Sequence, residues 1–386
     1  MTPMRVAHVI TRLIVGGAQE NTVSSVLGLH EKPDVNVRLY CGHSSGLEGS
    51  LEPLVEKTDG LFHLVPNLIR PVRPLNDLLA YRQLWREFDS FQPDIVHTHS
   101  GKAGFIGRLA AKHAGVPIII HSIHGPSFGA FQGSLANALF RNAEHLAGRW
   151  TDHFITVADA MRDQYLDAGI GQADDYTRIP SGFDIGPFLR TENSPSERKS
   201  LGLSPSNFVV GKIARFFQLK GHDDLFDIAP RLARRIPNIR FLLVGDGVLR
   251  KRFERLAKQI GCEQNFVFTG LVPPSEIPSL VGMMDALVHL SRREGLPRVL
   301  PQAMAAAKPI VAFDCDGASE VCLDGKTGYL IEPGDSAKLE ERLTKLAEEP
   351  TLRSELGQAG QTLVKKKFRI DQLVERQYEL YQRLLT

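Results

Sequence analysis

The stretch that decides the fold of this chain is Ser291-Arg-Arg-Glu-Gly-Leu-Pro-Arg-Val-Leu-Pro-Gln-Ala-Met-Ala-Ala-Ala-Lys-Pro309. A short apolar run at 285–290 precedes it and a second run at 309–313 follows it, and each is typical of a buried strand. Between them, apolar side chains recur at helical spacing. The stretch therefore predicts a strand–loop–helix–strand unit of an α/β sheet.

The loop of this unit is suited to an anionic ligand. It contains Glu294-Gly295, and a glycine lets a ligand approach the backbone closely. The amides at the start of the expected helix point toward the loop, where they favour negative charge. Alone, the unit is a common α/β crossover, so its meaning depends on the rest of the chain.

Length and composition predict a soluble protein of several domains. A chain of 386 residues corresponds to roughly two to three domains. Its apolar content of 42% and charged content of 23% are those of globular proteins. The net charge of +2, without a basic stripe interleaved with aromatics, argues against nucleic acid as a partner.

Cysteine usage and the first residues predict a cytoplasmic location. The cysteines lack Cys-x-x-Cys spacing, which disfavours a zinc site or a disulfide framework and favours a reducing compartment. They are Cys41, Cys262, Cys315 and Cys322. The chain enters a strand without a signal-peptide pattern, and no apolar run approaches the ~18 residues of a membrane span.

Strand and helix patterns alternate through two halves of the chain. The pattern predicts an N-terminal Rossmann-like domain at 1–190 and a C-terminal one at 205–370, each with a mostly parallel sheet. The stretch 181–207 is rich in glycine, proline and charge and is interpreted as a linker. The residues 371–386 form a final helix, expected to pack back on the N-terminal domain. Two such domains would face each other across a cleft.

Two loops carry residues suited to phosphate groups. Gly16-Gly17 lies between the first strand and the first helix, where backbone amides can face a phosphate, although a tight turn is the better explanation without the rest of a Gly-x-Gly-x-x-Gly fingerprint. Arg215 and Lys220 follow the strand at 208–213 and suit a diphosphate. Two solvated loop cations are an equally strong alternative for this pair.

Two further motifs have both a structural and a functional interpretation. His97-Thr-His99 and His124 end neighbouring strands, and we interpret His97 as structural and His124 as the functional candidate. Asp314-Cys-Asp316 looks like a metal-binding pair, but a turn or helix cap explains it better. We expect no required metal.

Taken in order, these motifs resemble those of the retaining glycosyltransferases of family 4, which have the GT-B fold. The resemblance covers nearly the whole chain. It rests on Gly16-Gly17-Ala18, His97–Gly104, Ile123-His-Gly125, Ile179–Gly182, Arg215 with Lys220-Gly221, Gly245-Asp-Gly247, the stretch with Glu294, Gly317–Glu320 and Asp324–Gly328.

The resemblance implies a role for each matching residue. Arg215 and Lys220 would bind the donor diphosphate and stabilise the leaving group, Glu294 would bind donor-sugar hydroxyls, and His124 would lie near the reacting centre. Residues that would contact the donor through backbone or side chain are Gly16, Gly17, Val272, Gly295, Leu296, Pro297, Arg298 and Gln302. Of these, Gly17 would also line the acceptor side, Val272 would lie at the base edge and Gln302 at the ribose.

The implied reaction moves a sugar from a nucleotide-diphosphate sugar, a UDP-sugar by preference, to a hydroxyl with retention. The acceptor is expected to be a carbohydrate or a lipid-linked molecule of the cell envelope, and no cofactor is required. Electrostatic stabilisation of the diphosphate and domain closure would drive the reaction. The chain departs from the usual Glu-x7-Glu pair, because Gln302 stands at the second position and lacks a carboxylate's charge.

Two alternatives stay open from the sequence. One is a GT-B UDP-sugar 2-epimerase, which would turn over the nucleotide sugar without an acceptor. The other is a non-enzymatic sugar-binding protein, which would bind free sugar without a nucleotide. A further hypothesis is peripheral contact with the inner face of the cytoplasmic membrane through Pro66–Pro74, a loop with Arg70, Arg73 and exposed-looking aliphatic residues, although an ordinary solvated loop explains it as well.

Overall fold

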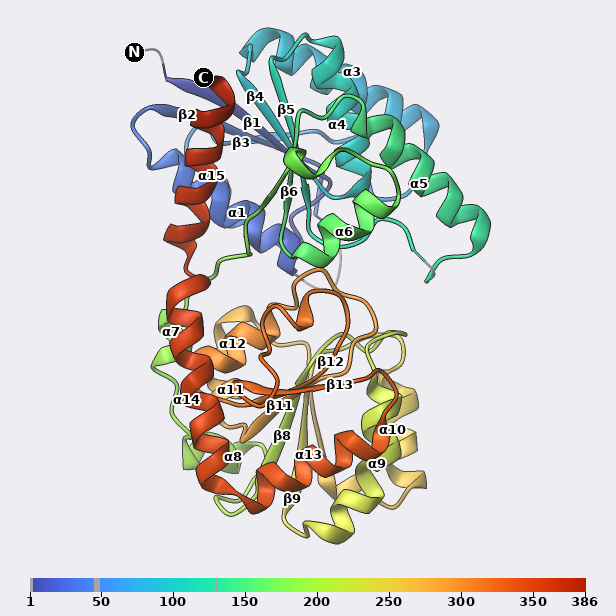
Figure 1. The fold of residues 1–386 in the computed structure, drawn as a ribbon, viewed down its shortest axis with the longest axis vertical. Helices are drawn as coiled ribbons and strands as arrows, with labels where there is room; N and C mark the ends of the chain where they lie inside the picture. The colour runs from blue at the N-terminus through green and yellow to red at the C-terminus, as the bar shows by residue number, and fades with distance from the viewer. Residues whose placement is uncertain (1–2, 45–48, 130) are drawn as a thin grey trace. The chain divides into compact units, whose positions relative to one another are not determined.

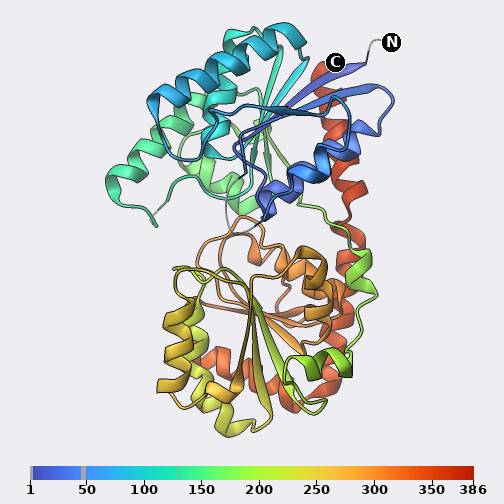
Figure 2. The same ribbon diagram turned by 180° about the vertical axis from the view of Figure 1, so that it is seen from behind.

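The computed structural model describes residues 3–44, 49–129 and 131–386, which form two compact units. The N-terminal unit comprises Met1–Phe183 with Arg369–Thr386, and the C-terminal unit comprises Asp184–Phe368. Each unit is a parallel sheet covered by helices (Figures 1 and 2).

The N-terminal unit has a seven-stranded parallel sheet in the order β3-β2-β1-β4-β5-β6-β7. Its strands are β1 (Met4–Ile10), β2 (Val35–Cys41), β3 (Phe62–Leu64), β4 (Ile95–His99), β5 (Ile118–Ile123), β6 (His153–Thr156) and β7 (Tyr176–Arg178). The central strands form because their apolar, β-branched runs are buried on both faces.

Helices cover both faces of this sheet. They are α1 (Gly17–His30), α2 (Glu52–Val55), α3 (Pro74–Phe91), α4 (Gly101–His113), α5 (Ser134–Gly148), α6 (Asp159–Asp167), the 3₁₀ turn η1 (Ala173–Asp175) and α15 (Ile370–Leu385). Alternate residues of β1 divide between two cores, Val6 and Ile10 in one and Ala7 and Val9 in the other. The first core includes side chains of α1 and α15, and the second includes side chains of α3 and α4.

The C-terminal unit has a six-stranded parallel sheet in the order β10-β9-β8-β11-β12-β13. Its strands are β8 (Phe208–Ile213), β9 (Ile239–Val244), β10 (Phe266–Gly270), β11 (Ala286–His289), β12 (Ile310–Phe313) and β13 (Gly328–Ile331). Its helices are α7 (Gly186–Leu189), α8 (Pro195–Ser200), α9 (His222–Arg235), α10 (Arg250–Gln259), α11 (Ile277–Gly282), α12 (Val299–Ala305), α13 (Ser336–Glu348) and α14 (Pro350–Lys367). Short 3₁₀ turns are η2 (Glu263–Asn265), η3 (Pro274–Glu276) and η4 (Asp316–Ala318).

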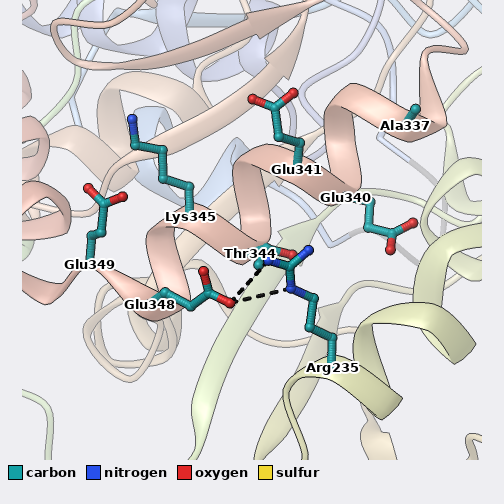
Figure 3. Close-up of a pocket in the computed structure, with 8 residues that line it drawn as sticks. All are labelled: Arg235, Ala337, Glu340, Glu341, Thr344, Lys345, Glu348 and Glu349. Carbon is teal, nitrogen blue, oxygen red and sulfur yellow. Dashed lines mark hydrogen bonds and ion pairs between the residues drawn. The ribbon is translucent and has the colours of Figure 1, made fainter.

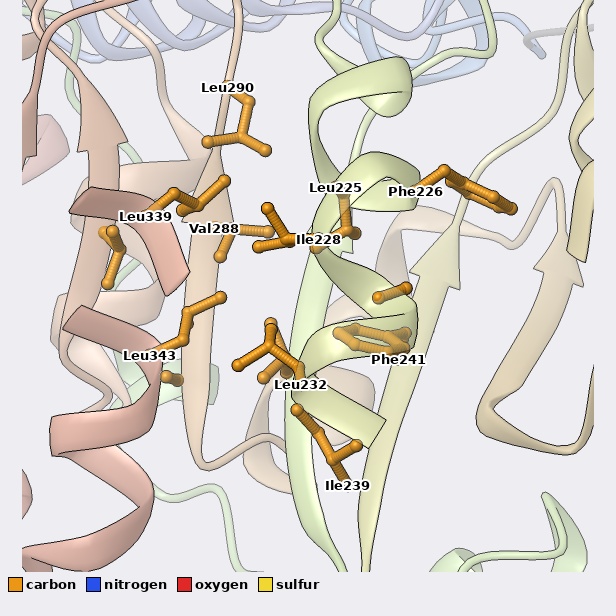
Figure 4. Packing of buried hydrophobic residues seen from close by; sticks show 14 of the residues in the cluster. Leu225, Phe226, Ile228, Leu232, Ile239, Phe241, Val288, Leu290, Leu339 and Leu343 are labelled. Atoms are coloured by element: carbon orange, nitrogen blue, oxygen red, sulfur yellow. The ribbon is translucent and has the colours of Figure 1, made fainter. Parts of the chain in front are cut away.

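The main core of this unit lies between the sheet and the pair α9 and α13. Figure 4 shows Leu225 and Leu232 of α9 and Leu343 of α13 facing Val288 of β11, and all four are fully buried. Burying each such side chain contributes about 1.5–3 kcal/mol. This packing fixes α9, whose first residues follow the loop that carries Arg215 and Lys220.

The stretch 181–207 differs from its interpretation as a linker. Most of it belongs to the C-terminal unit, and it contains α7 and α8. Arg198 is buried and donates to the carbonyl of Met283 at 2.7 Å and to the carboxylate of Asp285 at 3.0 Å. Its glycines and prolines therefore mark turns between short packed helices, which composition alone does not distinguish from an open connection.

Candidate functional site

The candidate site of the C-terminal unit is built from the loops that follow β8 and β11, which are neighbouring strands. The amide of Arg292 donates to the carbonyl of Leu219 at 2.8 Å, and the hydroxyl of Ser291 lies 3.2 Å from the same oxygen. Gly221 closes the first loop with φ of 63°, and a Cβ there would lie 1.9 Å from the carbonyl of Leu290. The two loops therefore form one bonded rim at the carboxyl end of the sheet.

The centre of this rim is an ion pair between Lys220 and Glu294. Their side chains are 21% and 27% exposed. Burial alone would raise the pKa of Glu294, but the charges of Lys220 and His289 and hydrogen bonds from Lys220 and Ser291 outweigh it and hold the pKa below its ordinary value. Glu294 is therefore ionised at neutral pH, and it accepts hydrogen bonds.

Asp316 holds the backbone of Glu294 in place. The amide of Glu294 donates to Oδ2 of Asp316 at 2.7 Å, and the amide of Gly317 donates to the carbonyl of Gly295 at 3.0 Å. This role of the Asp314–Asp316 motif was not expected from the sequence. The adjacency of β11 and β12 explains it, because loops that leave neighbouring parallel strands meet at the same edge.

Further charges lie around the ion pair. Arg292 makes a bidentate pair with Asp224, with distances of 2.6 and 2.7 Å. Lys212 of β8 is buried, and burial together with the charge of Lys220 lowers its pKa to about 7. Burial lowers the pKa of His289 to about 4, and its Nε2 lies 4.0 Å from Glu294. The sequence analysis assigned no role to Arg292, Asp224, Lys212 or His289. The only sign in the sequence was Lys212, which stands inside the otherwise apolar strand β8.

Arg215 lies on the same loop as Lys220, directly after β8. Its guanidinium lies 5.1 Å from the ring centroid of Phe217. The amide of Phe216 donates to the carbonyl of Asp246 at 2.9 Å, and a Cβ on Gly247 would lie 2.7 Å from the carbonyl of Phe216. The Gly245-Asp-Gly247 motif therefore supports the loop that carries Arg215.

The other predicted C-terminal residues lie around this rim or farther along the sheet. Gly295, Leu296 and Pro297 are buried, whereas Arg298 and Gln302 are half-buried. The helix α12 begins only at Val299, so the four residues 295–298 belong to the loop before a seven-residue helix. Val272 follows β10, which stands two places from β8 in the sheet order.

The remaining predicted residues belong to the N-terminal unit. Gly17 is the first residue of α1 and is exposed. Gly16 has φ of 174°, which any residue can adopt, but a Cβ there would lie 2.8 Å from Oε1 of Gln19. The glycine pair is therefore a tight entry to the helix, with its amides at the helix N-terminus.

His124 follows β5 and is half-buried. Its Nε2 lies 3.0 Å from Nδ1 of the buried His99. His97 is fully buried, and its two ring nitrogens bond to Ser122 at 2.7 Å and Tyr381 at 2.5 Å, which accords with the structural role expected for it. The sequence did not predict the hydrogen bond between Tyr381 and His97, because the two residues lie 284 positions apart.

A pocket of about 400 Å³ lies elsewhere on the C-terminal unit (Figure 3). It is lined by Arg235, Ala337, Glu340, Glu341, Thr344, Lys345, Glu348 and Glu349. Arg235 ends α9, a helix of 14 residues that spans about 20 Å, whereas the rim lies at its start. Four of its eight lining residues are glutamates and two are basic, and none of them is a predicted site residue.

Comparison with known proteins gives consistent results for both units. Residues 15–186 match the family described as Glycosyltransferase Family 4, and residues 193–363 match Glycosyl transferases group 1. The chain is 30% identical over 304 residues to the putative glycosyltransferase EpsD of Bacillus subtilis (strain 168), covering 77% of this chain and 78% of that protein.

Two further similarities extend over more of the chain. It is 25% identical to the UDP-Gal:alpha-D-GlcNAc-diphosphoundecaprenol alpha-1,3-galactosyltransferase of Escherichia coli, covering 90% of this chain and 89% of that protein. The crystal structure of Anabaena HepE in complex with UDP-glucose matches with a TM-score of 0.82 and 24% identity, covering 98% of this chain and 100% of that chain. This last similarity shows the fold, two Rossmann-like domains of the GT-B type.

Proposed function

This chain belongs to the group 1, family 4 glycosyltransferases, and from that premise we propose that it moves a sugar from a UDP-sugar to a hydroxyl acceptor, with retention, in the synthesis of a cell-envelope polysaccharide or glycolipid. The observation that carries the proposal is the Lys220–Glu294 pair, on a rim that Arg215 shares. It combines cations for a diphosphate with a carboxylate for sugar hydroxyls.

The roles of the rim residues follow from their charges. Arg215 and Lys220 stabilise the negative charge that develops on the leaving diphosphate, and Glu294 accepts hydrogen bonds from the donor sugar. The acceptor hydroxyl attacks from the side on which the diphosphate leaves, and the departing phosphate takes its proton. Because the cations come from the protein, we propose that no metal is needed, and transfer should persist in excess EDTA.

The choice of UDP rests on relatives rather than on a contact in this chain. The Escherichia coli relative is named for UDP-Gal, and HepE was crystallised with UDP-glucose. Another relative, from Mycolicibacterium smegmatis, is named as GDP-mannose-dependent. Thermal unfolding with UDP-sugars and with GDP-mannose separates the two, since a ligand at 100 times its Kd adds about 2.7 kcal/mol of stability. Stabilisation by GDP-mannose alone would contradict the UDP proposal.

A transfer assay tests the reaction itself. The stabilising UDP-sugar is incubated with and without a GlcNAc-diphosphopolyprenol acceptor, a choice suggested by the Escherichia coli relative. We expect UDP release and an α-linked product from an α-linked donor, both only with acceptor present, and a strong loss in Glu294→Gln. Turnover of the UDP-sugar without acceptor would support the epimerase instead, and a β-linked product would contradict retention.

We propose further that α3 and α5 of the N-terminal unit contact an anionic membrane surface. No helix among the described residues is long and apolar enough to cross a membrane. On α3, Leu75 is 77% exposed beside the exposed Arg73, and on α5, Leu135 and Leu139 are 85% and 64% exposed. Apolar side chains flanked by arginines suit anionic lipid.

The structure corrects part of the prediction for the loop expected to make this contact, namely that its aliphatic residues are exposed. Leu68, within Pro66–Pro74, is fully buried, whereas Val72 is 75% exposed and Arg70 and Arg73 are exposed. The apolar surface therefore continues from the loop into α3. The four cysteines are unpaired, which supports the cytoplasmic face of the membrane.

Co-sedimentation with vesicles containing phosphatidylglycerol tests the surface. The wild type should sediment with vesicles at low salt and less at high salt. A variant with Leu75→Gln, Leu135→Gln and Leu139→Gln should remain in the supernatant, whereas Leu323→Gln, at a 40% exposed leucine of the C-terminal unit, should behave as wild type. A wild type that does not sediment at low salt would overturn the proposal.

A further inference from the structure

A line of hydrogen-bonded side chains leads inward from His124. Its Nε2 lies 3.0 Å from Nδ1 of His99, and Nε2 of His99 lies 2.9 Å from Nδ1 of His8. Adjacent rings also approach each other, with centroids 5.3 Å apart for His99 and His124 and 5.2 Å apart for His8 and His99. The rings come from β1, β4 and the residue after β5, three adjacent places in the sheet.

The line continues to the C-terminal helix α15. The hydroxyl of Tyr381 lies 3.3 Å from Nε2 of His8 and 2.5 Å from Nδ1 of His97. Nε2 of His97 then lies 2.7 Å from the hydroxyl of Ser122. Tyr381 thus joins two histidines of the sheet through a single hydroxyl group.

The inner members of this line are neutral. His8, His97, His99 and Tyr381 have no exposed surface. Burial lowers the pKa of His8 to about 3, and burial together with neighbouring histidines holds the pKa values of His97 and His99 well below their ordinary value. A neutral imidazole has one N–H and one lone pair, so each ring donates one bond and accepts one.

One order of protons therefore runs through the whole line. If Tyr381 donates to His8, then His8 donates to His99, His99 donates to Nε2 of His124, and His124 carries its own proton on Nδ1. If Tyr381 donates to His97, each of these bonds reverses and His124 carries its proton on Nε2. The two orders place the proton of His124 on different nitrogens, and within each order the direction in which Tyr381 donates fixes the tautomer of His124, because a mixed order would leave two donors or two acceptors facing each other.

We propose that Tyr381, His8 and His99 are positioning residues that hold His124 in one tautomer and one ring orientation. The proposal rests on the proposed function only for its consequence, because the resemblance to family 4 glycosyltransferases implies that His124 lies near the reacting centre. The helix α15 would thus act on the orientation of His124 through Tyr381.

A divalent metal is the competing use of the same side chains. Ring nitrogens of His8, His97 and His99 lie within 4.8 Å of one another. However, both nitrogens of each ring already have hydrogen-bond partners, and the line contains no carboxylate to balance a buried dication. Two nitrogens bound to one tetrahedral zinc would also lie about 3.3 Å apart, farther than the 2.9 Å between His8 and His99.

Nitrogen NMR of protein labelled with 15N-histidine tests the proposal directly. The signals of His124 are assigned by their loss in His124→Gln, and their shifts report which nitrogen carries the proton. We expect one tautomer of His124 in the wild type and a mixture in Tyr381→Phe, which removes only the hydroxyl. The control Tyr81→Phe removes a hydroxyl bonded to Nδ1 of His113 at 2.6 Å on the surface of the same unit and should leave His124 unchanged.

Three results would overturn the proposal. The first is a mixture of His124 tautomers in the wild type, and the second is a His124 tautomer that Tyr381→Phe does not change. The third is a stoichiometric metal in the purified protein whose removal changes the nitrogen signals of His8 and His99. If Tyr381→Phe does not fold, His99→Gln interrupts the line next to His124 and gives the same test. The wild-type tautomer can be read without either variant.

Kinetics separate this proposal from the proposed function. Tyr381→Phe should lower kcat about tenfold, with the donor KM unchanged and a shifted pH profile, whereas Tyr81→Phe should not. If the wild type transfers no sugar, the proposed function fails while the NMR result still decides the proposal on the line. If the tautomer changes and kcat does not, His124 is positioned as proposed but does not act in the reaction.

Discussion

The two units place different chemistry at the same edge of the same kind of sheet. In the C-terminal unit the loops after β8 and β11 carry charges, paired as Lys220 with Glu294 and as Arg292 with Asp224. In the N-terminal unit the strands β1 and β4 carry neutral histidines that bond to one another. A parallel sheet thus supplies only the position, and the residues at strand ends decide the function.

The difference follows from burial. Lys220, Glu294 and Arg292 of the C-terminal rim are partly exposed, so water and their partners stabilise the charges, and the buried Asp224 is stabilised by its bidentate pair with Arg292. The inner histidines of the N-terminal line, His8, His97 and His99, are fully buried, where a charge would be costly, and they remain neutral instead. A diphosphate needs the first arrangement, and a defined proton position needs the second.

The largest expected effect of this difference is on stability in mild acid. Histidines in the unfolded chain have a pKa of about 6.5 and bind protons below that pH. Burial lowers the pKa of His8 to about 3 and holds the pKa values of His97, His99 and His121 well below 6.5, so these side chains resist protonation in the folded unit. Their stabilisation is complete above pH 6.5 and is lost as the pH falls toward the folded pKa values, by about 1.4 kcal/mol per histidine and pH unit. Four histidines would remove about 4 kcal/mol between pH 6.5 and 5.5.

Tryptophan fluorescence measures this effect in one unit. Both tryptophans, Trp85 and Trp150, belong to the N-terminal unit. Urea unfolding followed by fluorescence should show a steep loss of stability from pH 7 to 5.5. Hydrogen exchange of the C-terminal unit, where the buried histidines are His222 and His289, should change less, because the N-terminal unit also buries His153. Equal slopes in both units would contradict this account.

The second effect is on catalysis at the C-terminal rim. Arg215→Ala and Lys220→Ala should each lower kcat about 10²–10³-fold, because each removes a cation from the leaving diphosphate. Arg231→Ala, which removes a surface cation paired with Glu340 in the same unit, is the matched control and should keep its activity. If either rim variant transfers sugar at the wild-type rate, the residue that it replaces does not belong to the leaving-group site.

The smallest effect is expected at the position that departs from the family pattern. Gln302→Glu should lower the donor KM by about threefold to tenfold, since a carboxylate binds a ribose diol more strongly than an amide does. Gln302→Ala should raise it. A donor KM that is equal in all three proteins would show that this half-buried residue of α12 does not contact the donor.

The regular elements were largely predictable because they depend on local pattern. The strands predicted at 35–41, 208–213, 239–244 and 310–313 are strands with those bounds. The strand β7 (Tyr176–Arg178) was missed, because three half-buried residues at a sheet edge leave no apolar run. The resemblance to family 4 glycosyltransferases and the GT-B fold are confirmed by the family matches and by the similar structures.

The candidate site was predictable only in part, because its bonds join distant residues. The sequence pointed to Lys220 and Glu294 separately, but the ion pair spans 74 positions. Asp316 was interpreted as a local turn, and its bond to the amide of Glu294 depends on two adjacent strands. The bond between Tyr381 and His8 spans 373 positions and has no local signal. The catalytic and donor roles of individual residues stay predictions.

The division between the two units is tested most directly by calorimetric titration of UDP. Lys220→Ala should raise the Kd for UDP at least about tenfold, which corresponds to the loss of one charge-assisted bond to phosphate. Tyr381→Phe should bind UDP as the wild type does, although its transfer rate falls. Weaker UDP binding in Tyr381→Phe, together with wild-type binding in Lys220→Ala, would contradict the assignment of the diphosphate to the charged rim of the C-terminal unit.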